Sequence, residues 1–206
     1  MTNVFLELIH RAASIGWVYD SIQVLAGASI TRRRLRRYLA DCGGRVLDIG
    51  GGTGALAGLL PMGCSCTCLD NEMPKLQCCA GKALASPLLA DATLMPIQSG
   101  SIDVVTCVAV THHLTDDQLD EVLRESARVL KTEGSLILMD AVLKPSRLTG
   151  RILWALDRGA HPKPSAILRL AIERHFSVDQ WERLAVYHEY IITVCRKSSA
   201  FTAKMT

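Results

Sequence analysis

Short apolar runs and stretches of helical periodicity alternate along the central part of the chain. The apolar runs have the length of strands that are buried on both faces of a sheet. Strands that alternate with helices in this way predict a doubly wound, mostly parallel α/β sheet. The strands are predicted to end near residues 49, 69, 92, 108 and 140, and the helices to span 55–60, 74–85 and 116–130.

The segments on either side of this alternation add helices and two more strands. Residues 1–44 are predicted to form helices that cover one end of the sheet. Residues 141–176 are predicted to form an insert, with one helix over 146–157 and a second helix capped by Ser165. The expected architecture is a seven-stranded sheet with an N-terminal helical lid. The last two strands, at 181–187 and 190–195, are predicted to close the sheet as an antiparallel pair.

The composition predicts one globular domain. A chain of 206 residues is long enough for a full core, and 49% of its residues are hydrophobic. The charge-free run from Ile49 to Leu69 has the length of a membrane span, but its glycines and Pro61 favour a loop, a short helix and a strand. Glu7 and Arg11 interrupt the apolar N-terminus, so no signal peptide is expected and the predicted location is the cytoplasm. A net charge of +3 is too small to require a nucleic acid as partner.

The first predicted strand runs into clustered glycines between Gly50 and Gly54, and a helix follows. Glycine lets the backbone approach a ligand closely, so this arrangement predicts a nucleotide site at the start of the sheet. Gly50, Gly52 and Ala55 fit the G-x-G-x-x-G/A pattern of dinucleotide-binding proteins, which alone is a weak signal. Asp48 disfavours that ligand, because its carboxylate would repel a pyrophosphate and attract a ligand with ammonium and sulfonium groups. A turn without any ligand is the third alternative.

Two further acids follow the next two predicted strands. Asp70 ends the second strand, where a carboxylate can accept both ribose hydroxyls of an adenosine; the alternative is that it caps the helix beginning at Pro74. Asp91 ends the third strand, where it can accept the amino group of adenine or bond to its own loop. The carboxyl ends of parallel strands share one edge of the sheet. Asp48, Asp70 and Asp91 are therefore expected around one crevice.

At these residues the chain resembles the class I S-adenosylmethionine-dependent methyltransferases. Their D/E-x-G-x-G-x-G motif is met by Asp48, Gly50, Gly52 and Gly54, and their acid after the third strand is met by Asp91. The resemblance covers about residues 45–140. Within the superfamily it is greatest toward small enzymes that act on quinones, lipids and natural products.

The resemblance continues along the later strands. A proline-containing loop leads into the strand that begins at Ile102, where the family often has Phe. The segment from Arg128 to Leu136 is similar to the family's "RVLKPGGxL", although Thr132 and Glu133 replace its Pro and first Gly. These replacements alter a turn far from the expected cofactor.

The resemblance implies a Rossmann-like fold and methyl transfer from S-adenosylmethionine. It divides the chain into a helical lid (1–44), a cofactor-binding core (45–140), an acceptor-side insert (141–176) and a closing hairpin (177–206). The implied acceptor is a small molecule, such as a natural product, a quinone or a lipid-like compound, with transfer to oxygen slightly favoured. A protein or RNA methyltransferase and a noncatalytic S-adenosylmethionine-binding relative are the alternatives. Cofactor contacts are implied for Tyr19, Asp48, Gly50, Gly51, Gly52, Gly54, Asp70, Asn71, Asp91, Ala92 and Val108.

Two adjacent histidines follow the fourth strand on the cofactor side of the sheet. His112 and His113 are candidates for a general base or for positioning the acceptor, because imidazole titrates near neutral pH. The same pair is frequent in this subgroup with different acceptors, which favours the alternative of a structural or cofactor-framing role. His161 in the insert is a further base candidate or an ordinary loop residue.

Cysteines and arginines form two further clusters. Cys64, Cys66 and Cys68 alternate along the second strand, so their thiols are expected on one face as small buried hydrophobes, and no metal is expected. The basic segment Arg32–Arg37 would suit a peripheral contact with anionic lipid or a phosphorylated substrate. Its alternative is the solvated face of a helix.

Overall fold

The computed structural model describes residues 28–81, 85–146, 150, 154, 161–186 and 188–198. Tyr19, the predicted lid before residue 28 and most of the helix predicted over 146–157 lie outside the described residues. The roles expected for them therefore stay predictions.

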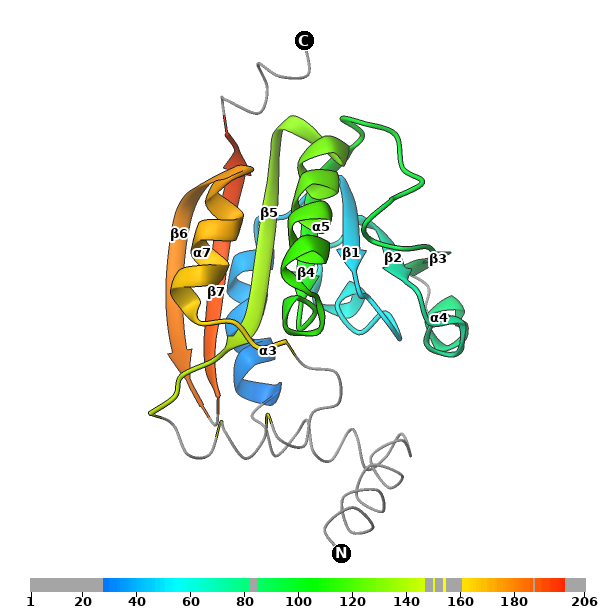
Figure 1. Ribbon diagram of the computed structural model, residues 1–206. Coiled ribbons are helices and arrows are strands. Elements are labelled where there is room, and N and C mark those ends of the chain that lie inside the picture. The colour runs from blue at the N-terminus through cyan, green and yellow to red at the C-terminus, as the bar shows by residue number, and fades with distance from the viewer. Residues whose placement is uncertain are drawn as a thin grey trace, which may run out of the picture.

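One seven-stranded sheet forms the centre of the protein, in the order β3-β2-β1-β4-β5-β7-β6 (Figure 1). Strands β1 to β5 pair in parallel, whereas β7 is antiparallel to both β5 and β6. This confirms the predicted mostly parallel sheet with an antiparallel C-terminal strand. The strands are β1 (Arg45–Ile49), β2 (Ser65–Asp70), β3 (Ala85–Leu89), β4 (Ile102–Val108), β5 (Leu130–Val142), β6 (Phe176–Ala185) and β7 (Glu189–Lys197).

The order of the strands reverses at β1. This strand pairs with β2 on one side and with β4 on the other, so the chain leaves β1 in one direction and later returns to continue in the other. In open α/β sheets a ligand crevice forms beyond the carboxyl ends of the strands at such a point. The glycine loop after β1 and the histidines after β4 both follow these carboxyl ends.

Helices cover the two faces of the sheet with apolar stripes. Helices α5 and α7 lie in front of the sheet in Figure 1, and α3 lies behind it. Leu119 and Leu123 of α5 belong to the front core with Val105, whereas Leu35 and Leu39 of α3 pack behind the sheet. Within each pair the spacing of four residues places the side chains on one helix face. The described helices are α3 (Ala28–Leu39), α4 (Met73–Ala80), α5 (Asp116–Val129) and α7 (Ser165–Glu173), with 3-10 turns η1 (Ala57–Leu59) and η2 (Thr111–His113).

Three predictions about helices need correction. Residues 55–60 form turns and η1 rather than an α-helix, because Gly54 at φ +73° precedes them and Pro61 forces Leu60 into an extended conformation. Helix α4 ends at Ala80, before the predicted limit of 85. Ser165 is the first residue of α7, and Pro164 rather than Ser165 is its N-cap.

The cysteines of β2 fill the space beneath the glycine loop. Cys66 and Cys68 are buried, with their Sγ atoms 3.9 Å apart, and pack with Cys79 of α4. The expectation of buried packing is confirmed for these two. Cys64 instead precedes the strand, packs behind the sheet and donates to the carbonyl of Cys42 at 3.4 Å. Within the described ranges, no group of three or more His, Cys, Asp or Glu side chains could hold a metal ion.

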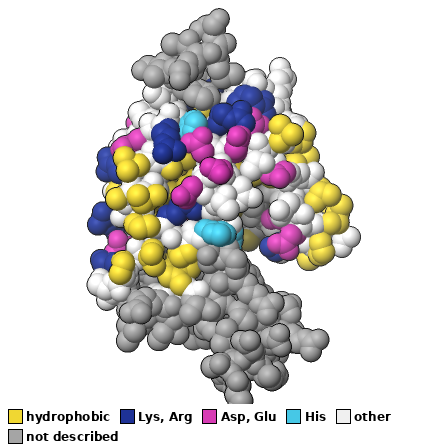
Figure 2. All heavy atoms as spheres, viewed as in Figure 1, with side chains coloured by type: hydrophobic (Ala, Val, Ile, Leu, Met, Phe, Trp, Pro, Cys, Tyr) yellow, Lys and Arg dark blue, Asp and Glu magenta, His cyan; other side chains and the backbone are white. Residues whose placement is uncertain are grey.

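The surface in Figure 2 mixes charges over α5 and gathers apolar side chains over α7, where Ile167 and Leu170 are exposed. The segment from Ile49 to Leu69 forms the end of β1, the glycine turns, η1 and most of β2. Among the described residues, no helix is long and apolar enough to cross a membrane.

Candidate active site

The glycine loop is a tight turn bonded to the neighbouring strand. The amides of Gly50 and Gly51 both donate to the carbonyl of Leu69 in β2, at 2.8 and 3.1 Å. Gly50, Gly52 and Gly54 have φ values of +66°, +51° and +73°, which side chains rarely tolerate. A Cβ atom at Gly54 would also lie 2.9 Å from the Sγ of Cys79. The turn therefore requires glycine for both its conformation and its packing.

Asp70 holds the glycine turn from the end of β2. Its Oδ2 accepts from the amide of Gly52 at 3.0 Å, and its Oδ1 accepts from the amide of Glu72 at 2.9 Å. The alternative of a helix cap is wrong, because the N-cap of α4 is Glu72 and lies beyond Asp70. Neighbouring Asn71 is exposed. Asp70 thus connects the carboxyl end of β2 to the glycine turn, in agreement with the prediction that both lie around one crevice.

Asp48 is a buried carboxyl group below the turn, 3% exposed. Its Oδ1 accepts a hydrogen bond from the Oγ1 of Thr106 in β4 at 2.8 Å. Burial raises the pKa of Asp48 to about 7; the bond from Thr106 opposes this shift and the charge of Asp70 adds to it. A carboxyl group in this state is poised to ionise when a cation arrives.

The raised pKa of Asp48 predicts a pH-dependent stability in the absence of a cationic ligand. Between the unfolded pKa near 4 and the folded value near 7, the folded protein binds more protons, so the free energy of unfolding falls as the pH rises. Asp48→Asn removes this penalty. The stability of the variant relative to the wild type is expected to increase by about 2–3 kcal/mol from pH 5 to pH 8. Urea denaturation at both pH values measures the difference, and an equal pH response of the two proteins would contradict the prediction.

Asp91 bonds within its own loop. Its Oδ1 accepts from both the amide and the Oγ1 of Thr93 at 2.8 Å, and these bonds lower the pKa of the exposed carboxyl. The loop-bonding alternative is thus observed, and a contact of Asp91 with adenine stays a prediction. Ala92 beside it is half-buried.

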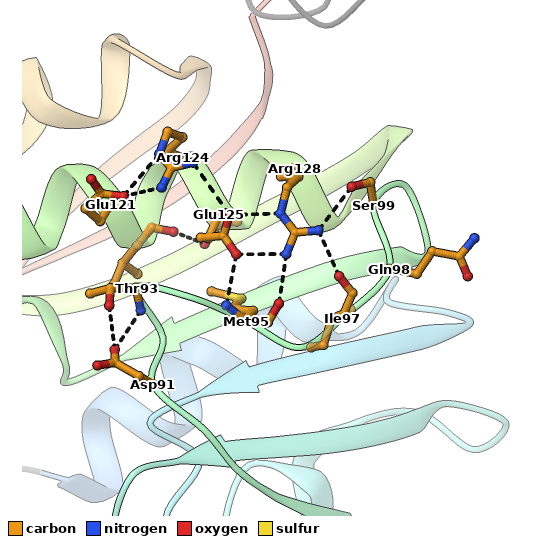
Figure 3. A network of polar contacts seen from close by, with 12 residues as sticks. Asp91, Thr93, Met95, Ile97, Gln98, Ser99, Glu121, Arg124, Glu125 and Arg128 are labelled. Carbon is orange, nitrogen blue, oxygen red and sulfur yellow. Dashed lines mark hydrogen bonds and ion pairs between the residues drawn. The ribbon is translucent and has the colours of Figure 1, made fainter.

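Figure 3 shows how the loop after Asp91 is fixed to α5. Buried Glu125 accepts from the amide of Met95 at 2.9 Å and pairs with Arg128 at 2.8 Å. Arg128 in turn donates to the carbonyls of Met95 and Ile97 at 2.9 and 2.8 Å. The guanidinium fork satisfies several acceptors at once, so this pair fixes the loop that follows Asp91.

Arg128→Met is expected to lower the free energy of unfolding by about 2–4 kcal/mol, because it removes the main cationic partner of the buried Glu125 carboxylate and one donor to each of two loop carbonyls. The matched control is Arg124→Met on the same helix. Arg124 pairs with exposed Glu121 and lies farther from Glu125 than Arg128 does, at 3.7 Å, so its loss is expected to cost less than about 1 kcal/mol. Urea denaturation compares the two variants, and equal losses would show that the Glu125–Arg128 pair has no special role.

The two histidines form η2 immediately after β4. Val108 ends the strand half-buried, and Ala109 adopts a left-handed φ of +56° that redirects the chain. The rings of His112 and His113 lie side by side, with centroids 4.1 Å apart. A strained non-glycine residue of this kind often marks a functional turn.

Asp140 at the end of β5 holds His112 from below. Its Oδ1 lies 2.5 Å from the Nδ1 of His112, and its Oδ2 accepts from the Oγ1 of Thr111 at 2.6 Å and from the amide of His112 at 3.2 Å. Burial acts to raise the pKa of Asp140, but the charge of His112 and these hydrogen bonds outweigh it and leave the pKa lowered. The buried carboxylate therefore fixes the position of one imidazole.

Asp140 is not among the site residues predicted from the sequence. It is nevertheless an acid at the carboxyl end of a strand, as are Asp48 and Asp70, and that signal could have identified it. Asp140 and His112 are 28 residues apart in the sequence, and their pairing depends on the parallel register of β4 and β5.

A row of aromatic rings begins at His112 with Trp154 of the insert. The ring of Trp154 lies 5.4 Å from that of His112 and 4.6 Å from that of His188, measured between centroids. Tyr190 of β7 lies edge-on to His188 at 6.1 Å. His161, the further base candidate, is exposed and meets this turn through its backbone, because its amide donates to the carbonyl of His112 at 2.5 Å. The insert thus supplies apolar surface beside the histidine.

The fold and the acid-glycine site define a Rossmann-like nucleotide-binding protein with its crevice at β1 and β4. Residues 47–138 match the family model described as a methyltransferase domain. This match supports the resemblance of the central part of the chain to the class I S-adenosylmethionine-dependent methyltransferases.

The sequence relatives of this chain have names that state different methyl acceptors. A ubiquinone biosynthesis O-methyltransferase from Xanthomonas oryzae is 29% identical over 132 residues, which are 58% of this chain and 54% of that protein. The mouse tRNA (carboxymethyluridine(34)-5-O)-methyltransferase ALKBH8 is 33% identical over 132 residues, 62% of this chain and 17% of that protein. The chain thus spans about half the length, or less, of the curated relatives it matches.

A solved structure shares the fold at low sequence identity. The geranyl diphosphate C-methyltransferase from Streptomyces coelicolor A3(2), solved with Mg²⁺, geranyl diphosphate and S-adenosyl-L-homocysteine, has a TM-score of 0.68 and 12% identity. The alignment covers 83% of this chain and 81% of that one. This similarity supports the class I fold and leaves the acceptor open.

Proposed function

We propose that the protein transfers the methyl group of S-adenosylmethionine to an oxygen atom of a small-molecule acceptor, with His112 as the general base. The observation that carries this proposal is the His112–Asp140 pair, 2.5 Å between Nδ1 and Oδ1, at the adjoining ends of β4 and β5. His113 is the second candidate for the base.

The residues at the glycine turn fit this cofactor. Gly50, Gly51 and Gly52 leave the backbone open to close approach, and Asp70 already bonds the turn through Gly52. Asp48 offers a buried carboxyl that a cationic methionine end would draw into its charged form. We assign the cofactor contacts to these residues, with Asn71, Asp91, Ala92 and Val108 along the same edge.

Methyl transfer requires the protein to position the acceptor and to accept one proton from it. S-adenosylmethionine, when bound, supplies a methyl group that is already activated by the sulfonium. The chain must hold the acceptor in line and exclude water, and a base must take the hydroxyl proton. With Nδ1–H donating to Asp140, the Nε2 of His112 carries the lone pair that accepts this proton. Asp140 then stabilises the imidazolium that forms.

The aromatic surroundings favour a flat, largely apolar acceptor. The ring of Trp154 lies next to His112, and the rings of His188 and Tyr190 continue from it in a row; such rings stack well on an aromatic or quinone-like ring. A relative named for ubiquinone biosynthesis is consistent with an acceptor of this kind. A phenol or catechol hydroxyl is therefore the proposed methyl acceptor.

One surface feature favours a second candidate, an RNA acceptor. Arg32, Arg33, Arg36 and Arg37 are exposed on α3, and no ion pair for them is seen within the described ranges. Such a surface could contact phosphates of RNA, in line with the tRNA-modifying relative, or an anionic membrane at the periphery. The small molecule is preferred because the rings adjoin the proposed base.

Transfer of label from tritiated S-adenosylmethionine tests the proposal. The wild-type protein is incubated separately with phenols and catechols, with thiols, and with bulk tRNA, and each product is isolated. Label in the phenol or catechol products supports the proposal. Label only in tRNA supports the second candidate, and cofactor binding without label in any product would indicate a noncatalytic relative.

A further inference from the structure

Lys163 is a buried lysine whose three donors all face backbone carbonyls. The residue is 7% exposed, and its Nζ donates to the carbonyls of Leu114 at 2.6 Å, His161 at 3.1 Å and Thr111 at 3.4 Å. An ammonium group has three hydrogens, so these acceptors use its full capacity. A buried charge is tolerated only when it is satisfied in this way.

The three carbonyls belong to two different parts of the chain. Thr111 and Leu114 flank His112 and His113 in the turn after β4, whereas His161 lies in the insert. Two backbone bonds support the same junction. The amide of His161 donates to the carbonyl of His112 at 2.5 Å, and the carbonyl of Lys163 accepts from the amide of Leu143 at 2.8 Å, just beyond β5.

The charged groups around Lys163 come from the elements that form the site. The Oδ1 of exposed Asp116, at the start of α5, lies 3.7 Å from the ammonium, and buried Asp140 of β5 also attracts it. Burial nevertheless lowers the pKa of Lys163. The imidazoles of His112 and His113 belong to the turn whose carbonyls bond the ammonium, and a neighbouring positive charge disfavours their protonated forms.

We propose that Lys163 is a positioning residue that fastens the His112–His113 turn to the insert and keeps His112 in its neutral, base-competent form. This inference rests on the proposed role of His112 as base. The ammonium fixes the carbonyls on both sides of the histidines, and its charge opposes a second positive charge on the ring held by Asp140.

The test is Lys163→Met, which keeps most of the side-chain length but removes the charge and the donors. Lys144→Met is the matched control, because Lys144 lies near the same end of β5 and pairs with Glu189 instead. NMR follows the midpoint of the His112 titration in the full chain. The midpoint is expected to rise by about 0.5–1 pH unit in Lys163→Met and to stay unchanged in Lys144→Met.

Activity on an acceptor found by the label assay gives a second readout. In Lys163→Met the kcat is expected to fall about tenfold or more, with the acid limb of its pH profile moved to higher pH, while the KM for S-adenosylmethionine stays the same. Lys163→Arg, which keeps the charge and donors, is expected to restore the acid limb. Lys163→Gln serves as the neutral variant if the methionine variant does not fold, with the same shift expected.

The outcomes separate this inference from the proposed function. If His112→Gln abolishes transfer while the neutral Lys163 variants leave both the His112 titration and the acid limb in place, Lys163 is not a positioning residue. If His112→Gln leaves transfer intact, the assignment of the base fails. An upward shift of the titration in the neutral variants, reversed by Lys163→Arg, supports the inference by a measurement that needs no acceptor.

Discussion

Replacing His112 with Gln is expected to lower kcat by about 10²–10⁴-fold, the usual contribution of a general base. Glutamine keeps a polar side chain of similar size but has no basic nitrogen that can take a proton from the acceptor. The KM for S-adenosylmethionine is expected to stay within about threefold, because the proposed cofactor contacts lie at the glycine turn and its acids. Initial rates with the acceptor found by the label assay measure both constants.

Two further variants make this result specific. Asp140→Asn is expected to reduce kcat strongly as well, because an amide cannot stabilise the imidazolium through the 2.5 Å contact with His112. His113→Gln is the matched control in the same turn and is expected to keep most of the activity. A His112→Gln protein with nearly full activity, or an inactive His113→Gln protein with an active His112→Gln protein, would contradict the assignment.

Replacing Asp70 with Ala is expected to weaken S-adenosylmethionine binding by about 10–100-fold, since a hydrogen bond to a charged group contributes about 1.5–3 kcal/mol. The change removes the proposed acceptor for the ribose hydroxyls. It also leaves the amides of Gly52 and Glu72 without the oxygens that they now bond at 3.0 and 2.9 Å. Both effects act on the same turn, so the loss of affinity for S-adenosylmethionine is expected to lie near the upper end of this range.

Calorimetric titration with S-adenosylmethionine measures the affinity of the Asp70→Ala variant. Glu72→Gln is the control, because Glu72 is an exposed acid two residues away that pairs with exposed Lys75. Its affinity is expected to equal that of the wild type. Equal affinities for the wild type and Asp70→Ala would show that Asp70 does not hold the cofactor.

Most of the sheet could be predicted from the sequence because its signals are local. Apolar runs followed by acids predict the first three strands, although β3 ends at Leu89, before the predicted limit near residue 92, and β4 at Ile102–Val108 agrees with its prediction residue for residue. Thr115 caps α5 by accepting from the amide of Gln118, and its own amide donates to the Gln118 side chain to complete a capping box. These features depend on neighbours within a few residues.

The histidine site could be predicted only in part because its partners are distant in the chain. His112 is predicted from its place after β4, but Asp140 and Trp154 contact it, and Lys163 contacts its turn, only through strand register and the packing of the insert. The prediction of an α-helix over 55–60 is wrong for a local reason. The apolar pattern of this segment is helical, but too few residues lie between Gly54 and Pro61 for a cooperative helix.

Calorimetric titration of the wild-type protein with S-adenosylmethionine and with NAD identifies the nucleotide that the glycine turn binds. S-adenosylmethionine is expected to bind at a single site and NAD not to compete with it, because Asp48 lies below the turn as a buried carboxyl group with its pKa near 7. A cation is expected to ionise this group, so binding near pH 6–7 should also release a proton, seen as a dependence of the heat on the buffer. Tighter binding of NAD, or no binding of S-adenosylmethionine, would contradict the account.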